Sequence, residues 1–213
     1  MSDAVTVVSS ATEPAGNLMT ARIGCCGKIP SRGDFIRLGL PRDFLDGWDG
    51  WFGAMLAASR EILGEGWSGA WLEAPVWHFA LAAGVCGART AIGVWMPSVD
   101  RVGRYFPLTI AALADDATPE SLLCSGGGFL GAAAEAGLAA VTVDLSPDEL
   151  VARILDAAAR PPHPAAVDTS LRPETRALWW TSGAPRVAAA EVLTAGLPDA
   201  ETFLAMLDGS QRR

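Results

Sequence analysis

The sequence has few of the residues from which metal sites and nucleophilic active sites are usually built. It holds two histidines, four cysteines and one lysine among 213 residues. Zinc sites take their ligands mainly from cysteine and histidine, and a serine or cysteine hydrolase needs a histidine and an acid beside its nucleophile. We therefore expect no metal site, no cofactor and no catalytic centre, and we predict that the protein is not an enzyme.

Positive charge is also scarce, since 16 basic residues stand against 24 acidic ones and the formal net charge is -8. Nucleic acids and anionic membranes attract concentrated positive charge, so we expect neither as a partner. The most apolar window, residues 126–143, consists largely of glycine and alanine and is interrupted by Glu135. It predicts a packed helix without membrane insertion.

The N-terminal residues and the cysteines predict a cytoplasmic protein. Residues 1–20 lack a basic start and a strongly apolar run, so we interpret them as a disordered or loose tail and not as a signal peptide. Cys25 and Cys26 are adjacent, and Cys86 and Cys124 are isolated. A bridge between neighbouring cysteines is strained, so we expect free thiols in a reducing cytoplasm.

The pattern of apolar residues predicts strands separated by helices. Short β-branched and aromatic runs bounded by glycine or proline predict the strands, and apolar residues at helical spacing behind a capping residue or proline predict the helices. The predicted strands cover residues 23–26, 76–81, 90–96, 106–113, 141–145 and 177–181, and the predicted helices cover residues 41–63, 68–73, 118–140, 147–155 and 199–207. Such an order favours a single-domain three-layer α/β sandwich with a mixed central sheet over residues 21–209, followed by a short tail at 210–213.

Two polar loops hold the candidate site. Residues 27–35 (GKIPSRGDF) follow the first predicted strand, and residues 97–107 (PSVDRVGRYFP) connect two later ones. A phosphate-binding loop is excluded, because position 22 is arginine where glycine is required and position 29 is isoleucine where serine or threonine is required. We expect the loops to meet at one end of the sheet as a charged rim. Its members are Lys28, Ser31, Arg32, Asp34, Ser98, Asp100, Arg101 and Arg104. The alternative is a structural brace, in which the charges hold the loops together.

Other groupings offer weaker candidates for chemistry. His78 lies in a predicted buried strand and His163 among prolines, and neither Ser31 nor Ser98 has the context of a nucleophile elbow. The acidic groups at 115–116 and 144–149 stand at helix starts, where capping explains them.

An apolar strand should raise the pKa of the thiols of Cys25 and Cys26. Trp179 and Trp180 point to opposite faces of a predicted strand. One should be core, and the other is either core on the second face or an exposed anchor for a partner.

Four stretches together resemble one family. Residues 27–35 (GKIPSRGDF), 74–79 (APVWHF), 96–108 (MPSVDRVGRYFPL) and 178–183 (LWWTSG) are similar to segments of the TagF (ImpM) family, which is associated with type VI secretion. The resemblance extends over residues 22–208. It implies an α/β sandwich and a cytoplasmic, non-enzymatic, post-translational repressor of type VI secretion that is linked to a forkhead-associated scaffold protein. The alternatives are a domain that senses a small anion or nucleotide, and a structural assembly factor of the same machine.

Overall fold

The computed structural model describes residues 18–143, 145–159 and 174–211. In chain order, the elements in these ranges are η1 (Leu18–Thr20), β1 (Arg22–Gly27), β2 (Ile36–Leu38), α1 (Arg42–Leu63), η2 (Gly64–Gly66), α2 (Trp67–Glu73), β3 (Trp77–Leu81), β4 (Thr90–Met96), β5 (Leu108–Ala114), α3 (Pro119–Thr142), α4 (Pro147–Ala158), β6 (Ala177–Thr181), β7 (Ala190–Thr194), α5 (Ala200–Leu207) and η3 (Gly209–Gln211).

The seven strands form one sheet in the order β2-β1-β5-β4-β3-β6-β7. Each neighbouring pair of described strands is antiparallel. The prediction of a mixed sheet is therefore wrong. Parallel neighbours need a crossover connection of a dozen or more residues, whereas β1–β2, β3–β4 and β4–β5 are joined by shorter loops, which suit antiparallel pairs. The helices α3 and α4 do separate β5 from β6, but β6 joins β3 in the antiparallel direction.

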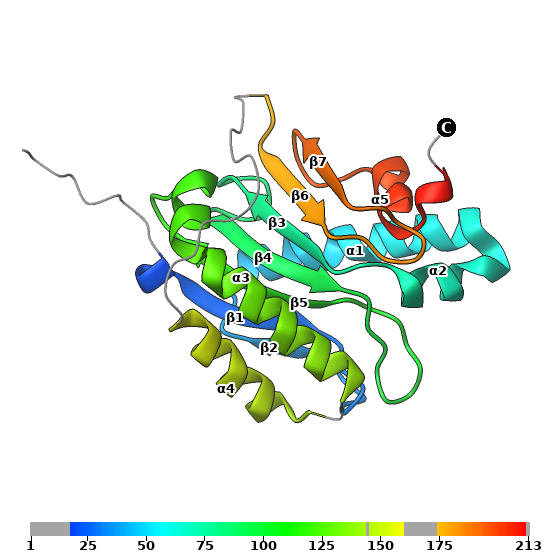
Figure 1. Cartoon of the computed structure of the whole chain (residues 1–213), viewed down its shortest axis with the longest axis horizontal. Coiled ribbons are helices and arrows are strands. Elements are labelled where there is room, and N and C mark those ends of the chain that lie inside the picture. Colours follow the sequence, from blue (N-terminus) through cyan, green and yellow to red (C-terminus); the bar gives the residue numbers. More distant parts are fainter. Residues whose placement is uncertain (1–17, 144, 160–173, 212–213) are drawn as a thin grey trace, which may run out of the picture.

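Helices cover both faces of the sheet, as Figure 1 shows. Side chains alternate along a strand, so Ile92 and Val94 of β4 face α3 while Trp95 faces the side of α1, α2 and α5. Every residue of β4 and of β5 is buried. The central strands therefore read as continuous apolar runs, which is the pattern expected of strands covered on both faces.

The two faces differ in composition. On the side of α1, α2 and α5 lie seven of the eight tryptophans, namely Trp48, Trp51, Trp67, Trp71, Trp77, Trp95 and Trp179. On the other side α3 approaches the sheet through small residues, and a Cβ added to Gly137 would lie 2.4 Å from Cε of Met96.

By length and composition α3 is apolar enough to cross a membrane. Its buried residues, among them Phe129, pack on the sheet instead.

The structure differs from the sequence prediction at residues 141–145, at the two edge strands and near both ends of the chain. The predicted strand 141–145 is wrong, because α3 continues to Thr142, whose hydroxyl donates to the carbonyl of Leu138. Strands β2 and β7 were not predicted, since both lie at sheet edges and carry exposed polar residues that break the apolar pattern. The predicted tail 1–20 lies mostly outside the described residues, but Leu18 is buried against the sheet. Residues 210 and 211 of the predicted C-terminal tail belong to η3, and residues 212–213 lie outside the described residues.

Candidate functional site

The two polar loops lie side by side at one end of the sheet. Gly27 ends β1 and pairs with Leu108, the first residue of β5, while Met96 ends β4 and pairs with the same Leu108. Two backbone bonds join the loops: the amide of Lys28 donates to Pro107 at 3.3 Å, and the amide of Arg101 donates to Arg32 at 3.0 Å. The sheet register therefore brings the two halves of the charged rim together, as the sequence predicted.

The inner part of the charged rim is a buried ion pair. Nζ of Lys28 lies 2.7 Å from Oδ2 of Asp100, and both residues are at least 96% buried. The same carboxylate oxygen accepts a bond from Nε of Arg104 at 2.7 Å. Oδ1 of Asp100 accepts the backbone amides of Val102 and Arg104 at 3.0 and 2.9 Å. Four donors therefore surround one carboxylate, which offsets the cost of burying it.

These contacts set the ionisation of Asp100. Burial alone would raise the pKa of this carboxyl, because it disfavours the charged form. The hydrogen bonds from Lys28 and from the side chain and amide of Arg104, with a further bond from the amide of Val102, outweigh burial and hold the pKa well below its usual range. Asp100 is therefore an anion throughout the physiological range and not a proton donor.

The lowered pKa makes stability depend on pH in a defined direction. An unfolded aspartate has a pKa of about 3.9. The stabilisation from Asp100 is therefore complete above about pH 4 and is lost as the pH falls through the folded-state value. We expect the difference in unfolding free energy between the wild type and Asp100→Asn to be constant from about pH 7 to pH 5 and to shrink at about pH 3. Urea denaturation of both proteins at each pH measures this difference, and a gap that widens toward acid would contradict the assignment.

The two serine hydroxyls of the charged rim hold backbone. Oγ of Ser98 donates to the carbonyl of Lys28 at 2.8 Å, and Oγ of Ser31 donates to the carbonyl of Leu145 at 2.5 Å. Ser31 thereby ties the first loop to the segment between α3 and α4. Both hydroxyl protons are used in these bonds, so neither serine is arranged as a nucleophile beside a base.

The outer part of the charged rim faces solvent. Arg32, Asp34 and Arg101 are exposed, and within the described ranges no side-chain hydrogen bond or ion pair is found for them. Arg104 is exposed too, but its guanidinium donates to the carbonyl of Gly33 as well as to Asp100. A Cβ added to Gly33 would lie 3.9 Å from Nη2 of Arg101. Two arginines of the second loop thus approach one glycine of the first.

Apolar side chains adjoin these arginines, which sequence reasoning missed. Phe35 and Leu38 are each 38% exposed, and Val102 is 64% exposed. Phe35 packs edge-on against Phe106 at 4.8 Å between ring centroids, and Nζ of Lys28 lies 5.0 Å from its ring centre. An open groove of about 330 Å³ runs along this edge and is lined by Arg32, Asp34, Phe35, Ile36, Arg37, Leu38 and Pro147. The available signal was a phenylalanine directly after Asp34 and a valine directly after Arg101, both in loops rich in charged residues.

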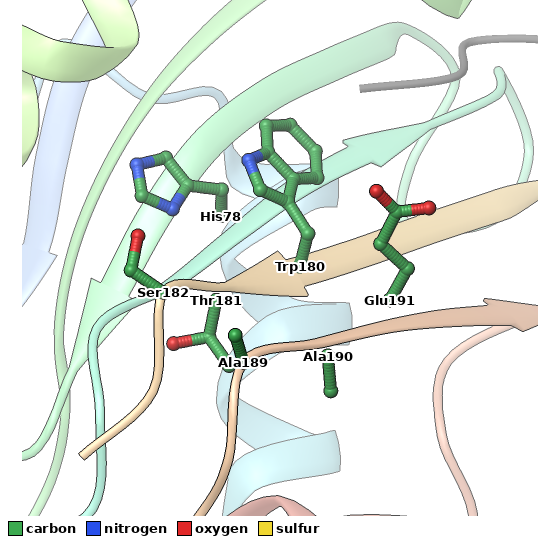
Figure 2. A pocket seen from close by; sticks show the side chains of 7 residues that line it. All are labelled: His78, Trp180, Thr181, Ser182, Ala189, Ala190 and Glu191. Atoms are coloured by element: carbon green, nitrogen blue, oxygen red, sulfur yellow. The ribbon is translucent and has the colours of Figure 1, made fainter. Parts of the chain in front are cut away.

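The double tryptophan segment divides between two environments. Trp179 is fully buried, so it is not an exposed anchor. Trp180 is half-buried on the opposite face and stacks on His78, with ring centroids 5.2 Å apart and an interplanar angle of 17°. Figure 2 shows both rings and Glu191 of β7 on the same side of the sheet. They line an open groove of about 640 Å³ together with Thr181, Ser182, Ala189 and Ala190.

The remaining candidates for chemistry have structural surroundings. Burial lowers the pKa of His78 and raises that of Cys25 and of Cys86 to about 12, so the three groups are neutral near pH 7. The four cysteines are free. Glu149 caps α4 by accepting bonds from the amide and hydroxyl of Ser146.

Metal-ligating residues do not gather in the described ranges. There, no three histidine, cysteine or acidic residues are grouped closely enough to hold a metal ion. His163 and Asp144, which the sequence analysis considered, lie outside the described residues.

Comparisons with known proteins give one consistent result. Residues 24–157 match the family model described as TagF N-terminal domain, type VI secretion system-associated. The crystal structure of PA0076 from Pseudomonas aeruginosa PAO1 is similar, with a TM-score of 0.72 and 31% sequence identity over 88% of this chain and 94% of that one. No curated protein matches. The chain therefore belongs to the TagF family of type VI secretion system-associated proteins.

Proposed function

We propose that the protein is a cytoplasmic, non-enzymatic accessory protein that represses type VI secretion after translation by binding a component of the machine. A forkhead-associated scaffold protein is the partner we expect. One observation carries the proposal: Lys28 and Asp100 neutralise one another in the inner part of the rim, while Arg32 and Arg101 stay exposed without side-chain partners in the described ranges. Paired groups hold the loops in place, and unpaired ones are available to another molecule.

This division favours binding over catalysis. A general acid or base needs a pKa near the working pH, whereas contacts hold the pKa of Asp100 far below it. A nucleophile needs a base within hydrogen-bonding reach, whereas Ser31 and Ser98 donate to backbone carbonyls. The guanidinium groups of the arginines are planar and provide several donors that suit carboxylates and phosphates.

The proposal predicts the effect of deleting the gene. In a strain able to assemble the machine, deletion should raise the release of the secreted tube protein, and complementation should lower it again. Immunoblotting of culture supernatants measures the release, with a cytoplasmic marker as a control for lysis. Unchanged release would contradict repression. Abolished release would instead support the alternative of a structural assembly factor.

A domain that senses a small anion or nucleotide is the second candidate, and the approach of Arg101 and Arg104 to Gly33, which directly follows Arg32 in the chain, favours it. A ligand at 100 times its dissociation constant adds about 2.7 kcal/mol to the stability of the folded state. A thermal-shift screen of phosphates, carboxylates and nucleotides would therefore reveal such a ligand as a rise in melting temperature. The same rise should be absent from Arg32→Gln/Arg101→Gln.

A further inference from the structure

We infer that the outer part of the charged rim binds an extended acidic segment of the protein partner, with an apolar side chain of that segment in the groove beside β2. This inference rests on the proposed function, because it assigns the surface through which the partner is bound. The surface consists of Arg32, Arg101 and Arg104 with the exposed apolar residues Phe35, Leu38 and Val102.

The charge of the surface is opposite to that of the molecule. Lys28, Arg32, Arg101 and Arg104 stand here against the two carboxylates of Asp34 and Asp100, which leaves an excess of two positive charges on a chain whose net charge is -8. Arg37, which also lines the groove, is paired with Asp49 and adds nothing to this excess. Screening limits such effects to about 8–10 Å at physiological salt, so a partner in contact with the loops responds to the local excess. The rest of the molecule repels an acidic partner and thereby favours this one site of approach.

The apolar residues indicate a protein segment in preference to a free anion. A small anion needs only the guanidinium groups, whereas Phe35, Leu38 and Val102 would stay exposed beside it. Arginine and aromatic residues are enriched at the centres of protein interfaces, where apolar contacts exclude water from the polar ones. A groove of about 330 Å³ is large enough to receive one apolar side chain of the segment.

The position of the groove indicates an extended segment. It runs along Ile36, Arg37 and Leu38, which form β2, and β2 is an edge strand that pairs only with β1 among the described strands. A chain lying along a sheet edge can meet unpaired backbone groups and place alternate side chains on the strand. Arg32 and Arg101 border this path at the end where β1 leads into the first loop.

The surface is held in shape before the partner arrives. Asp100 fixes Arg104, Arg104 donates to Gly33, and the amide of Arg101 donates to Arg32. Binding therefore has to order few backbone degrees of freedom, and a preorganised site loses less free energy on association. The buried ion pair thus fixes the positions of the loops that carry the exposed arginines.

The decisive experiment compares two double charge reversals. Arg32→Glu/Arg101→Glu should weaken binding at least about tenfold and reduce its dependence on salt, because rim charges act mainly on association. The matched control is Arg22→Glu/Arg153→Glu, which changes the net charge equally at exposed positions on β1 and α4. Binding is measured with purified proteins by biolayer interferometry at low and high salt, against two probes. These are the forkhead-associated scaffold of the same system and the acidic copolymer poly(Glu,Tyr).

The outcomes separate this inference from the proposed function. A scaffold that does not bind the wild type contradicts the proposed partner, and the copolymer then decides alone whether the surface takes acidic chains. The inference is wrong if Arg32→Glu/Arg101→Glu binds both probes as the control does, or if neither probe binds the wild type. Circular dichroism shows whether the variants are folded. If the glutamates disturb the loops, Arg32→Gln/Arg101→Gln removes the same positive charges. It should then bind both probes more weakly than the control Arg22→Glu/Arg153→Glu does.

Discussion

Replacing Asp100 with alanine is expected to destabilise the protein by about 3–5 kcal/mol. The change removes the acceptor of four hydrogen bonds and leaves the ammonium group of Lys28 buried without its counter-ion. An unpaired buried charge costs far more than a lost surface ion pair, which is worth about 0–1 kcal/mol. Urea denaturation followed by circular dichroism measures the difference in unfolding free energy.

Two variants test whether the burial of charge is the cause. Asp34→Ala removes an exposed carboxylate from the same site, and it should change stability by no more than about 0.5 kcal/mol. Lys28→Met/Asp100→Asn removes both buried charges and keeps an acceptor for the backbone amides, so it should be more stable than Asp100→Ala. If Asp100→Ala and Asp34→Ala have equal effects, the ion pair does not stabilise the loops.

The second large effect is expected for Gly27→Ala, which should cost about 3 kcal/mol or more. Gly27 ends β1 with a φ of +120°, a region that alanine rarely adopts. An added Cβ would lie 1.8 Å from the carbonyl oxygen of Pro107, where it cannot fit unless β1 and the second loop separate. Because Lys28 follows directly, the same movement would pull Nζ away from Asp100.

Gly103→Ala separates backbone strain from the steric clash. Gly103 also has a positive φ, of +85°, but a Cβ there meets no atom within 4 Å. We expect a loss of about 1–2 kcal/mol, which is the cost of the left-handed conformation alone. Thermal and urea unfolding of both variants measures the two costs, and a Gly27→Ala protein as stable as Gly103→Ala would contradict the close approach of the loops.

Much of the fold was predictable because its elements have local signals. Aromatic residues at helical spacing and the flanking Pro41 and Gly64 gave the bounds of α1 almost to the residue. The apolar runs alone did not give the direction of the strands, because such runs are alike in parallel and antiparallel sheets when both faces are covered. The short connections from β3 to β4 and from β4 to β5 did indicate antiparallel pairs. The edge strands β2 and β7 were missed since their exposed residues resemble those of a loop.

The sequence predicted which polar residues lie in the two loops, and the structure shows which of them are buried and which are exposed. The meeting of the two loops followed from the strands that bear them. Which charge is buried did not follow, because burial of Lys28 and Asp100 depends on packing between segments about 70 residues apart. The partial exposure of Phe35 was missed because an aromatic residue beside a charged loop is as typical of the core as of the surface.

The unequal distribution of tryptophan gives the two helical layers different optical properties. Seven indoles lie with α1, α2 and α5, and only Trp180 packs against the side of α3 and α4. Tryptophan fluorescence therefore reports mainly on one layer, whereas far-ultraviolet circular dichroism reports on the helices of both. If the layers unfold together, the two signals give the same denaturation midpoint. If α3 and α4 detach first, ellipticity falls while the emission spectrum still resembles that of the folded protein, so the pair of measurements reveals partial unfolding without any label.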